Sequence, residues 1–163
     1  MDEYKQDSGI LDVRVDDRMV HGIVATQWIP AAKATRAMVV NKRASESDMT
    51  RQALKLGTPA GVNLSILAPE KAIANIKNGN YVKQRVFVVC RYIKDAYELY
   101  KGGVTFARLN LGNVTQNMGK TTVLAKTVRV SDEELAMLKE MKASGIRITC
   151  QFRVEDPCVD AEI

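Results

Sequence analysis

Short runs of apolar and β-branched residues alternate along the chain with longer amphipathic segments. Each short run has the length and composition that are typical of a buried strand. The pattern predicts strands over residues 10–15, 37–40, 62–67, 85–90, 108–111, 127–130 and 146–152.

Several of the intervening segments carry signals for the start or the end of a helix. Ser131 and Glu134 have the spacing of a capping box, and Gly145 follows the apolar positions of that segment. This pattern predicts a helix between them. Three more helices are predicted: one capped by Ser45 or Ser47 that runs through Leu56, one from Pro69 to about Ile76, and one over residues 94–100 that stops at Gly102-Gly103.

The alternation of strands and helices indicates βαβ units. We therefore expect an α/β fold: an open, mainly parallel, twisted sheet of about seven strands with helices on both faces. A length of 163 residues with 46% hydrophobic content favours one domain, which we place at 10–163 after a flexible extension over 1–9. Residues 110–126 break the alternation with a long connection rich in Gly and Asn, and such connections are often functional.

Composition narrows the class of protein. The formal net charge of +5 favours anionic partners, but the cationic residues are not gathered into a stripe with aromatics, so we expect no nucleic-acid binding. The three cysteines have neither zinc-site nor disulfide-framework spacing, which predicts reduced thiols and no metal. No apolar run approaches the roughly 18 residues of a membrane span, and the amino terminus does not resemble a signal peptide. We expect a cytoplasmic protein.

The only histidine of the chain, His21, lies in the stretch VRVDDRMVHGIVATQWI, residues 13–29. This stretch joins the first predicted strand to an amphipathic helix, so it lies at the carboxyl edge of the sheet, where α/β proteins bind ligands. The apolar residues around His21 have helical spacing, which places it in the first turn of the helix or just before it. A helix start offers unpaired N–H groups and a positive dipole end, which bind phosphate.

The neighbours of His21 suit phosphoryl transfer. A neutral imidazole can attack phosphorus, and Arg18 could donate a forked pair of hydrogen bonds to the phosphoryl oxygens. Asp16 or Asp17 could accept a hydrogen bond from the other ring nitrogen, and the remaining acid would cap the helix or form a turn.

Other interpretations of this stretch have to be weighed. His21 could be an ordinary surface residue at a helix start. The motifs GxGxxG, GxxxxGK[ST] and GxSxG are absent, which argues against a nucleotide-binding domain and a serine hydrolase. A single histidine also argues against a metal site.

The stretch VDDRMVHGIVATQW resembles the signature of the IIB subunits of the mannose/sorbose family of the bacterial sugar phosphotransferase system, R-[IV]-D-[DE]-R-L-[IV]-H-G-Q-V-x-x-x-W. The matching residues are Arg14, Asp16, Asp17, Arg18, His21, Gly22, Val24 and Trp28. Later segments align in order, so the similarity extends from Ile10 to the end of the chain. The segment from Asn110 through Gly112 to Asn113 is most similar to the N-acetylgalactosamine branch of the family.

This resemblance implies an enzyme, a protein-histidine–sugar phosphotransferase that acts as a phosphocarrier. A phosphohistidine IIA domain or subunit would phosphorylate His21 at the ring nitrogen nearer the backbone. The group would then pass to a sugar bound by membrane IIC and IID subunits, with which the protein would associate peripherally. No cofactor or metal is needed if the donor is already a phosphohistidine, and a homo-oligomer stays open.

The resemblance also implies roles for particular residues. Arg18 would clamp the phosphoryl group and Asp16 would lie close to the ring. The loop backbone would hold the phosphoryl oxygens through Asp17, Met19, Val20 and Gly22. A neighbouring loop would contribute Asn110, Gly112 and Asn113. Apart from the resemblance, Lys42, Arg43 and Arg51 lie on another predicted strand-to-helix loop, where they would steer an acidic or phosphorylated partner or form a solvated surface.

Two positions depart from the family pattern. Ile23 stands where glutamine is usual, and Val114-Thr115 stand where Met-Ser or Met-His is commoner. They leave open the alternative of a catalytically silent or regulatory phosphate-binding module of the same fold. Non-specific nucleic-acid binding, a third hypothesis, predicts an affinity that falls steeply with salt and does not depend on His21.

Overall fold

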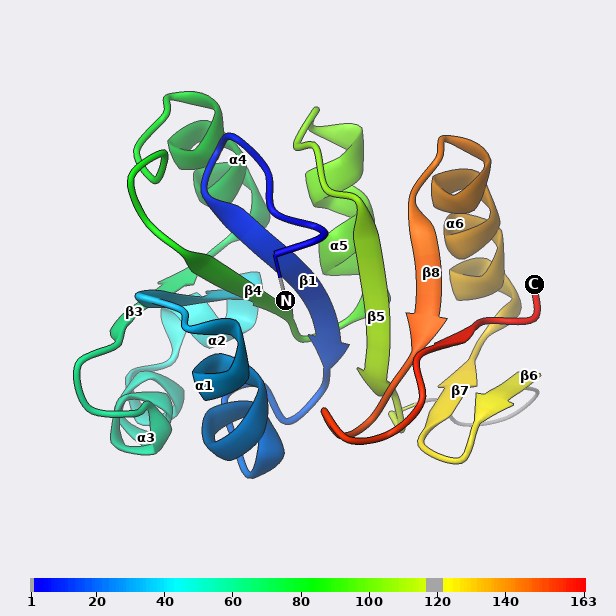
Figure 1. Cartoon of the computed structure of the whole chain (residues 1–163), viewed down its shortest axis with the longest axis horizontal. Coiled ribbons are helices and arrows are strands. Elements are labelled where there is room, and N and C mark those ends of the chain that lie inside the picture. Colours follow the sequence, from blue (N-terminus) through cyan, green and yellow to red (C-terminus); the bar gives the residue numbers. More distant parts are fainter. Residues whose placement is uncertain (1, 117–121) are drawn as a thin grey trace.

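The middle of the fold is a pair of strands with no exposed residue. All residues of β1 (Ile10–Asp16) and β4 (Val86–Cys90) are buried, and the two strands pair in parallel. The computed structural model, which describes residues 2–116 and 122–163, shows a sheet in the order β3-β2-β4-β1-β5-β8-β9 (Figure 1). The other strands are β2 (Arg36–Val40), β3 (Asn63–Leu67), β5 (Arg108–Asn113), β8 (Arg147–Cys150) and β9 (Val159–Asp160).

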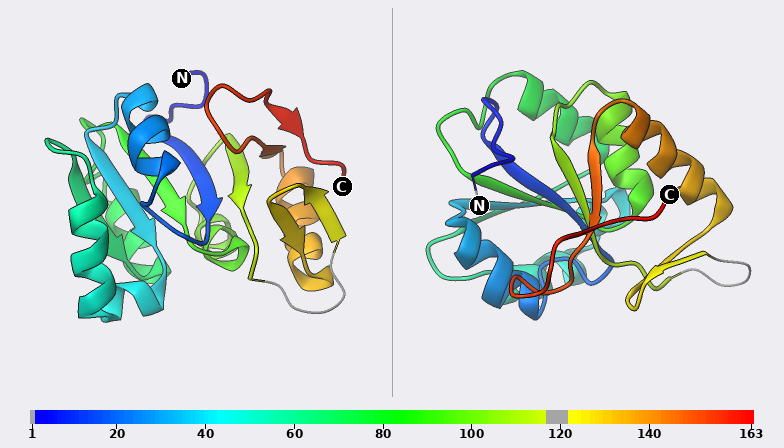
Figure 2. Two further views of the ribbon diagram at one scale, coloured as in Figure 1. Left: turned by 90° about the horizontal axis from the view of Figure 1, so that it is seen from below. Right: turned by 45° about the vertical axis from the view of Figure 1, so that its right-hand side comes forward.

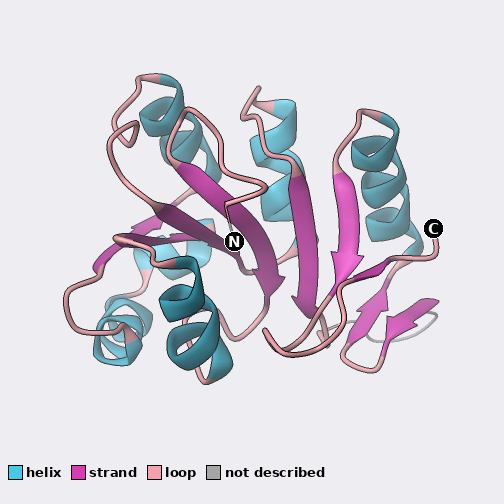
Figure 3. Cartoon of the chain, viewed as in Figure 1, coloured by secondary structure: helices cyan, strands magenta, loops and turns pink. Residues whose placement is uncertain are grey.

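Only β9 runs antiparallel to its neighbour in this sheet, and helices cover both of its faces, so the predicted α/β fold is confirmed (Figure 3). One face carries α4 (Pro69–Lys77), α5 (Ile93–Lys101) and α6 (Asp132–Ala143). The other carries η1 (Val24–Trp28), α1 (Ile29–Ala32), α2 (Lys42–Glu46) and α3 (Asp48–Gly57). Within the described ranges, none of the helices has the length and apolar character needed to cross a membrane.

The predicted helix signals are present, with one addition. Ser131 accepts a hydrogen bond from the backbone N–H of Glu134 at 3.1 Å, and Glu134 accepts one from Ser131 at 3.0 Å, which confirms the capping box. Ser47 caps α3, but the short helix α2 before it was not predicted because five residues are too few for a periodic pattern. Lys42 and Arg43, expected on a loop, are the first residues of α2.

The strand predictions need three corrections. Residues 127–130 contribute β7 (Val128–Val130), which is not in the main sheet: it pairs antiparallel with β6 (Thr122–Ala125) in a small ribbon beside α6 (Figure 2). β9 was not predicted, because its two exposed residues form no apolar run. The strand predicted over 146–152 ends at Cys150, where the chain leaves the sheet. Residues 117–121 of the predicted long connection lie outside the described residues.

The carboxyl ends of β1 and β5 form a topological switch point. The two strands are neighbours, but β1 leads to η1 and α1 on one face, whereas β5 leads through the ribbon to α6 on the other. Open α/β sheets bind ligands where the connections diverge in this way. The loop that bears His21 begins at this point.

Residues 2–9, for which we expected a flexible extension, contact the sheet. Asp2 forms an ion pair with Arg85 at 2.6 Å. The ring of Tyr4 lies 4.4 Å from Cζ of Arg108, and its hydroxyl accepts a hydrogen bond from Arg147 at 2.7 Å. Arg108 in turn forms a buried ion pair with Asp12, whose pKa is raised by burial. Tyr4 therefore covers a buried charged pair.

The contacts of Tyr4 predict that the first residues contribute to stability. Tyr4→Ala removes the ring from Arg108 and the hydroxyl from Arg147, so we expect the free energy of unfolding to fall by about 1–2 kcal/mol. Urea denaturation followed by circular dichroism measures this change. The exposed residue Glu3 supplies the control, Glu3→Ala. An unchanged midpoint in Tyr4→Ala would mean that the extension is flexible in solution.

Candidate functional site

His21 lies in the loop 17–22, between β1 and η1, which has Ile23 as its N-cap, and its side chain is exposed. The residues before it are buried: Met19 is 7% exposed and Val20 is 2% exposed, and both pack in an apolar cluster with Trp28. The side chains of Met19 and Val20 therefore hold the loop against the core. The imidazole faces solvent at the carboxyl edge of the sheet.

The loop backbone leaves two N–H groups free. Met19 and Gly22 have positive φ angles of 62° and 52°, and for Met19 this left-handed conformation costs about 1 kcal/mol or more. The N–H of Met19 donates to Asp16 at 2.9 Å, and that of His21 donates to Met19 at 3.0 Å. The N–H groups of Val20 and Gly22 have no hydrogen-bond partner among residues 2–116 and 122–163, so an anion can accept from them.

The carboxylate of Asp16, which is fully buried, is shared by two arginines. Arg18 donates to it from its backbone N–H at 3.0 Å and from Nε and Nη2 at 3.2 Å each. Arg14 donates to it from Nε at 3.4 Å and Nη2 at 3.3 Å. The hydrogen bond expected from the imidazole to Asp16 or Asp17 is absent. In the part of the chain that the structure describes, the ring of His21 makes no hydrogen bond.

Asp17 links the His21 loop to the end of β5. Its Oδ1 accepts from the side chain of Asn113 at 2.6 Å, and its Oδ2 accepts from N and Oγ1 of Thr115 at 2.7 and 2.9 Å. The N–H of Asp17 donates to the carbonyl of Asn113 at 3.0 Å. Asp17 therefore fixes the two loops of the switch point to each other, and its N–H and that of Met19 are occupied within the protein.

Arg14 is fully buried beneath the loop. Beyond Asp16, it donates to the carbonyls of Gln151 at 3.0 Å and Phe152 at 3.1 Å, and its guanidinium lies over the Trp28 ring at 5.0 Å. Burial lowers its pKa to about 10, so the group stays charged at neutral pH. A Cβ at Gly112 would lie 2.1 Å from Cζ of Arg14, which is why glycine stands there.

The residues of the expected neighbouring loop 110–113 therefore have two different roles. Asn110 is fully buried, donates to the carbonyl of Gln151 at 3.0 Å and accepts from Thr149 at 3.0 Å. Asn110 and Gly112 support the residues below the site, and only Asn113 contacts the His21 loop, through Asp17.

Phe152 is part of the site and was not predicted. Cζ of Arg18 lies 5.4 Å from the Phe152 ring, and the carbonyl of Phe152 accepts from Nε1 of Trp28 at 2.9 Å. Arg18 is thus held between the carboxylate of Asp16 and an aromatic face. The sequence around Phe152 carries no signal for this role. The only hint is that the family signature includes Arg14 and Trp28, two residues beneath the loop.

The structure also locates the predicted partner-binding cations and the three cysteines. Lys42 and Arg43 are exposed on α2, where they line a groove of about 510 Å³ that also contains acidic side chains. The cysteines are free thiols, and among the described residues there is no cluster of three or more His, Cys, Asp or Glu side chains that could hold a metal ion.

Comparison with known proteins gives a consistent set of similarities. Residues 10–162 match the family described as the sorbose subfamily IIB component of the phosphotransferase system (PTS). The chain is 31% identical over 147 residues to the sorbose-specific EIIB component of Lacticaseibacillus casei, which covers 90% of this chain and 89% of that protein. It is equally identical, 31%, to the N-acetylgalactosamine-specific IIB component 2 of Escherichia coli K12, with 90% and 92% covered.

A solved structure agrees with these similarities. The IIB domain of the sorbose permease from Klebsiella pneumoniae superposes with a TM-score of 0.86 at 28% identity, over 93% of this chain and 92% of that chain. The predicted resemblance to the mannose/sorbose IIB family is confirmed. Because the sorbose and N-acetylgalactosamine relatives are equally identical to the chain, identity does not favour the N-acetylgalactosamine branch.

The contact between Gly112 and Arg14 gives a prediction about the layer beneath the site. In Gly112→Ala, the added methyl group collides with a buried guanidinium that its hydrogen bonds hold in place, so we expect a loss of about 2–3 kcal/mol in stability. Thermal denaturation measures this loss. In an Arg14→Met background the same change should cost much less, because the colliding group is gone. Equal losses in both backgrounds would contradict the close packing of Gly112 against Arg14.

Proposed function

The chain belongs to the sorbose subfamily of IIB components of the bacterial sugar phosphotransferase system, and we propose that His21 is the residue that carries its phosphoryl group. IIB components are phosphocarriers and phosphotransferases, which pass a phosphoryl group from a IIA protein to a sugar. Such a carrier needs a nucleophile that partners can reach. His21 is the single histidine of the sequence, and its side chain is exposed.

The observation that carries this proposal is the shared carboxylate in the loop that bears His21. Two guanidiniums, those of Arg14 and Arg18, use one carboxylate, so these three side chains carry one net positive charge, whereas the carboxylate of Asp17 is bound on the β5 side by neutral groups of Asn113 and Thr115. Arg14 is buried, whereas the side chain of Arg18 is 38% exposed, so the charge can be neutralised from solvent at Arg18. A phosphoryl group on His21 would supply the missing negative charge.

Each transfer then exchanges one bond to phosphorus for another. In the loading step, a lone pair of the His21 ring forms the new N–P bond while the N–P bond of the donor phosphohistidine breaks and its electron pair stays with the donor ring. In the delivery step, a sugar hydroxyl forms an O–P bond, the N–P bond at His21 breaks, and the hydroxyl proton passes to a base of the transporter. Arg18 and the free N–H groups of Val20 and Gly22 stabilise the phosphoryl oxygens in both steps.

The partners follow from the family. A IIA protein loads His21, and membrane IIC and IID subunits hold the sugar, so we place the protein at the cytoplasmic side of that transporter. Lys42 and Arg43, exposed on α2, would attract the phosphorylated donor at short range, because the acidic side chains of the same groove offset their charge at longer distance.

Phosphorylation by a IIA partner tests the assignment of His21. We expect acid-labile, alkali-stable phosphate on His21, detected by mass spectrometry under alkaline conditions, and none on His21→Ala. Arg18→Met should slow loading by about 100- to 1,000-fold, the usual effect of losing one donor to a developing oxyanion. Lys71→Met, which removes an exposed cation from α4, is the matched control and should load normally.

Two results would contradict the proposal. Equal labelling of His21→Ala would place the phosphate elsewhere. A wild-type protein that stays unlabelled by a donor active on another IIB component would favour the catalytically silent module.

The contact between Phe152 and Arg18 gives a second kinetic prediction. Phe152→Ala removes the aromatic face but keeps the carbonyl that Arg14 and Trp28 use, so we expect folding to be retained and loading to slow by about 3- to 10-fold. Phe152→Tyr keeps the ring and should restore the rate. If Phe152→Ala loads at the wild-type rate, Phe152 does not position Arg18.

A further inference from the structure

The helix α3 carries an apolar stripe that the protein itself leaves uncovered. Met49 is 84% exposed and Leu56 is 89% exposed, and Ala53 between them is also exposed. Residues separated by three and four positions share one face of a helix, so the three side chains form a continuous strip. The helix is held to the fold by its other side, where Leu54 is 5% exposed. We call this strip of Met49, Ala53 and Leu56 the α3 face.

The α3 face is next to the loop that bears His21. A Cβ at Gly57, the last residue of α3, would lie 3.0 Å from the carbonyl oxygen of Val20. The backbones of α3 and of the loop are therefore in contact at that point. Leu56, at one end of the α3 face, precedes Gly57 in the chain, and Val20 precedes His21, so one residue on each side separates the end of the strip and the proposed phosphoryl acceptor from this backbone contact.

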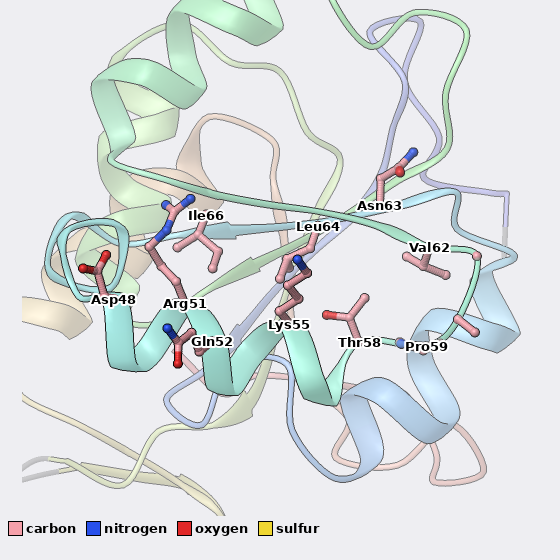
Figure 4. Close-up of a pocket in the computed structure, with 12 residues that line it drawn as sticks. Asp48, Arg51, Gln52, Lys55, Thr58, Pro59, Val62, Asn63, Leu64 and Ile66 are labelled. Atoms are coloured by element: carbon pink, nitrogen blue, oxygen red, sulfur yellow. The ribbon is translucent and has the colours of Figure 1, made fainter.

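A groove with cationic side chains flanks the same helix. It has a volume of about 710 Å³ and runs between α3 and β3, with Leu64 and Ile66 of β3 among its lining residues. Figure 4 shows Arg51 and Lys55 extending from α3 across this groove. Asp48 is the only acidic residue that lines it among the described residues, so its charge is predominantly positive.

We propose that the α3 face is the docking surface for the protein that phosphorylates His21; this inference rests on the proposed function. Transfer between two imidazoles requires the donor ring to reach the His21 ring, so the donor's surface must cover the residues that border the loop. An apolar centre with a charged rim is the usual composition of such an interface. Arg51 and Lys55 give that rim a positive sign, which complements the negative charge of the donor's phosphohistidine.

The test compares loading by a protein donor with loading by a small donor. In the variant Met49→Asp with Leu56→Asp, we expect the catalytic efficiency of loading by phosphorylated IIA to fall at least about 10-fold, mainly through a higher KM, because two carboxylates would enter an apolar contact. Labelling by phosphoramidate, which needs no docking surface, should match the wild type. Stability should also be unchanged, because both side chains are exposed.

The matched control is Val82→Asp. Val82 is 54% exposed and lies in the turn before β4, at the opposite edge of the sheet from His21, so this variant should load normally from both donors. It shows whether any added carboxylate on an exposed apolar residue slows loading.

The remaining outcomes are distinct. Wild-type loading of the double variant by the IIA donor would overturn the inference. Normal loading with impaired delivery to sugar would also overturn it, because the α3 face would then belong to the membrane subunits. Failure of the wild type to accept phosphate on His21 from either donor would instead overturn the proposed function itself.

Discussion

The site depends on one buried carboxylate that serves two arginines. Asp16 has no exposed surface, so its charge is tolerable only because Arg14 and Arg18 both donate to it. One anion cannot neutralise two cations. Arg14 is buried beneath the loop, so an anion from solvent cannot reach it. The excess positive charge is therefore accessible at Arg18, which lies in the same exposed loop as His21. The cluster of Arg14, Asp16 and Arg18 thus favours an anion beside Arg18, while the negative charge of Asp17 is held on the β5 side by Asn113 and Thr115.

This arrangement also determines how the end of the chain is folded. A buried guanidinium needs acceptors for its remaining donors, and for Arg14 these are the carbonyls of Gln151 and Phe152. The chain therefore leaves the sheet after Cys150 and turns near the carboxyl ends of β5 and β8, in red in Figure 1, before β9 pairs with β8 at the edge of the sheet. The same segment brings the Phe152 ring to Arg18. The stability of this segment and the orientation of Arg18 are consequently coupled.

The sequence predicts those parts of the structure that local patterns control. Apolar runs and capping residues locate β1 and α6, and the strand-to-helix transition puts His21 at the carboxyl edge. The partners of Asp16 and Asp17 could not be predicted, because two adjacent acids carry no signal for which arginine or amide will reach them. Phe152 was missed for the same reason, since its contact with Arg18 joins opposite ends of the chain.

A phosphocarrier has to bind two partners in turn at one residue. The loop must hold the phosphoryl group in a fixed position, and the ring must be accessible to both partners; different parts of the structure meet these two requirements. Below His21, buried side chains and the links from Asp16 and Asp17 hold the loop in one conformation, including the unfavourable backbone of Met19. Above it, the imidazole has no hydrogen-bond partner among the described residues, so it is free to approach either partner. The loop below His21 is fixed by these contacts and the imidazole above it is exposed. The same groups can therefore stabilise the phosphoryl oxygens during transfer from the donor and during transfer to the acceptor. Discrimination between donor and acceptor must then come from surfaces beside the loop, and the helix that bears the exposed apolar strip, α3, contacts the loop at Gly57.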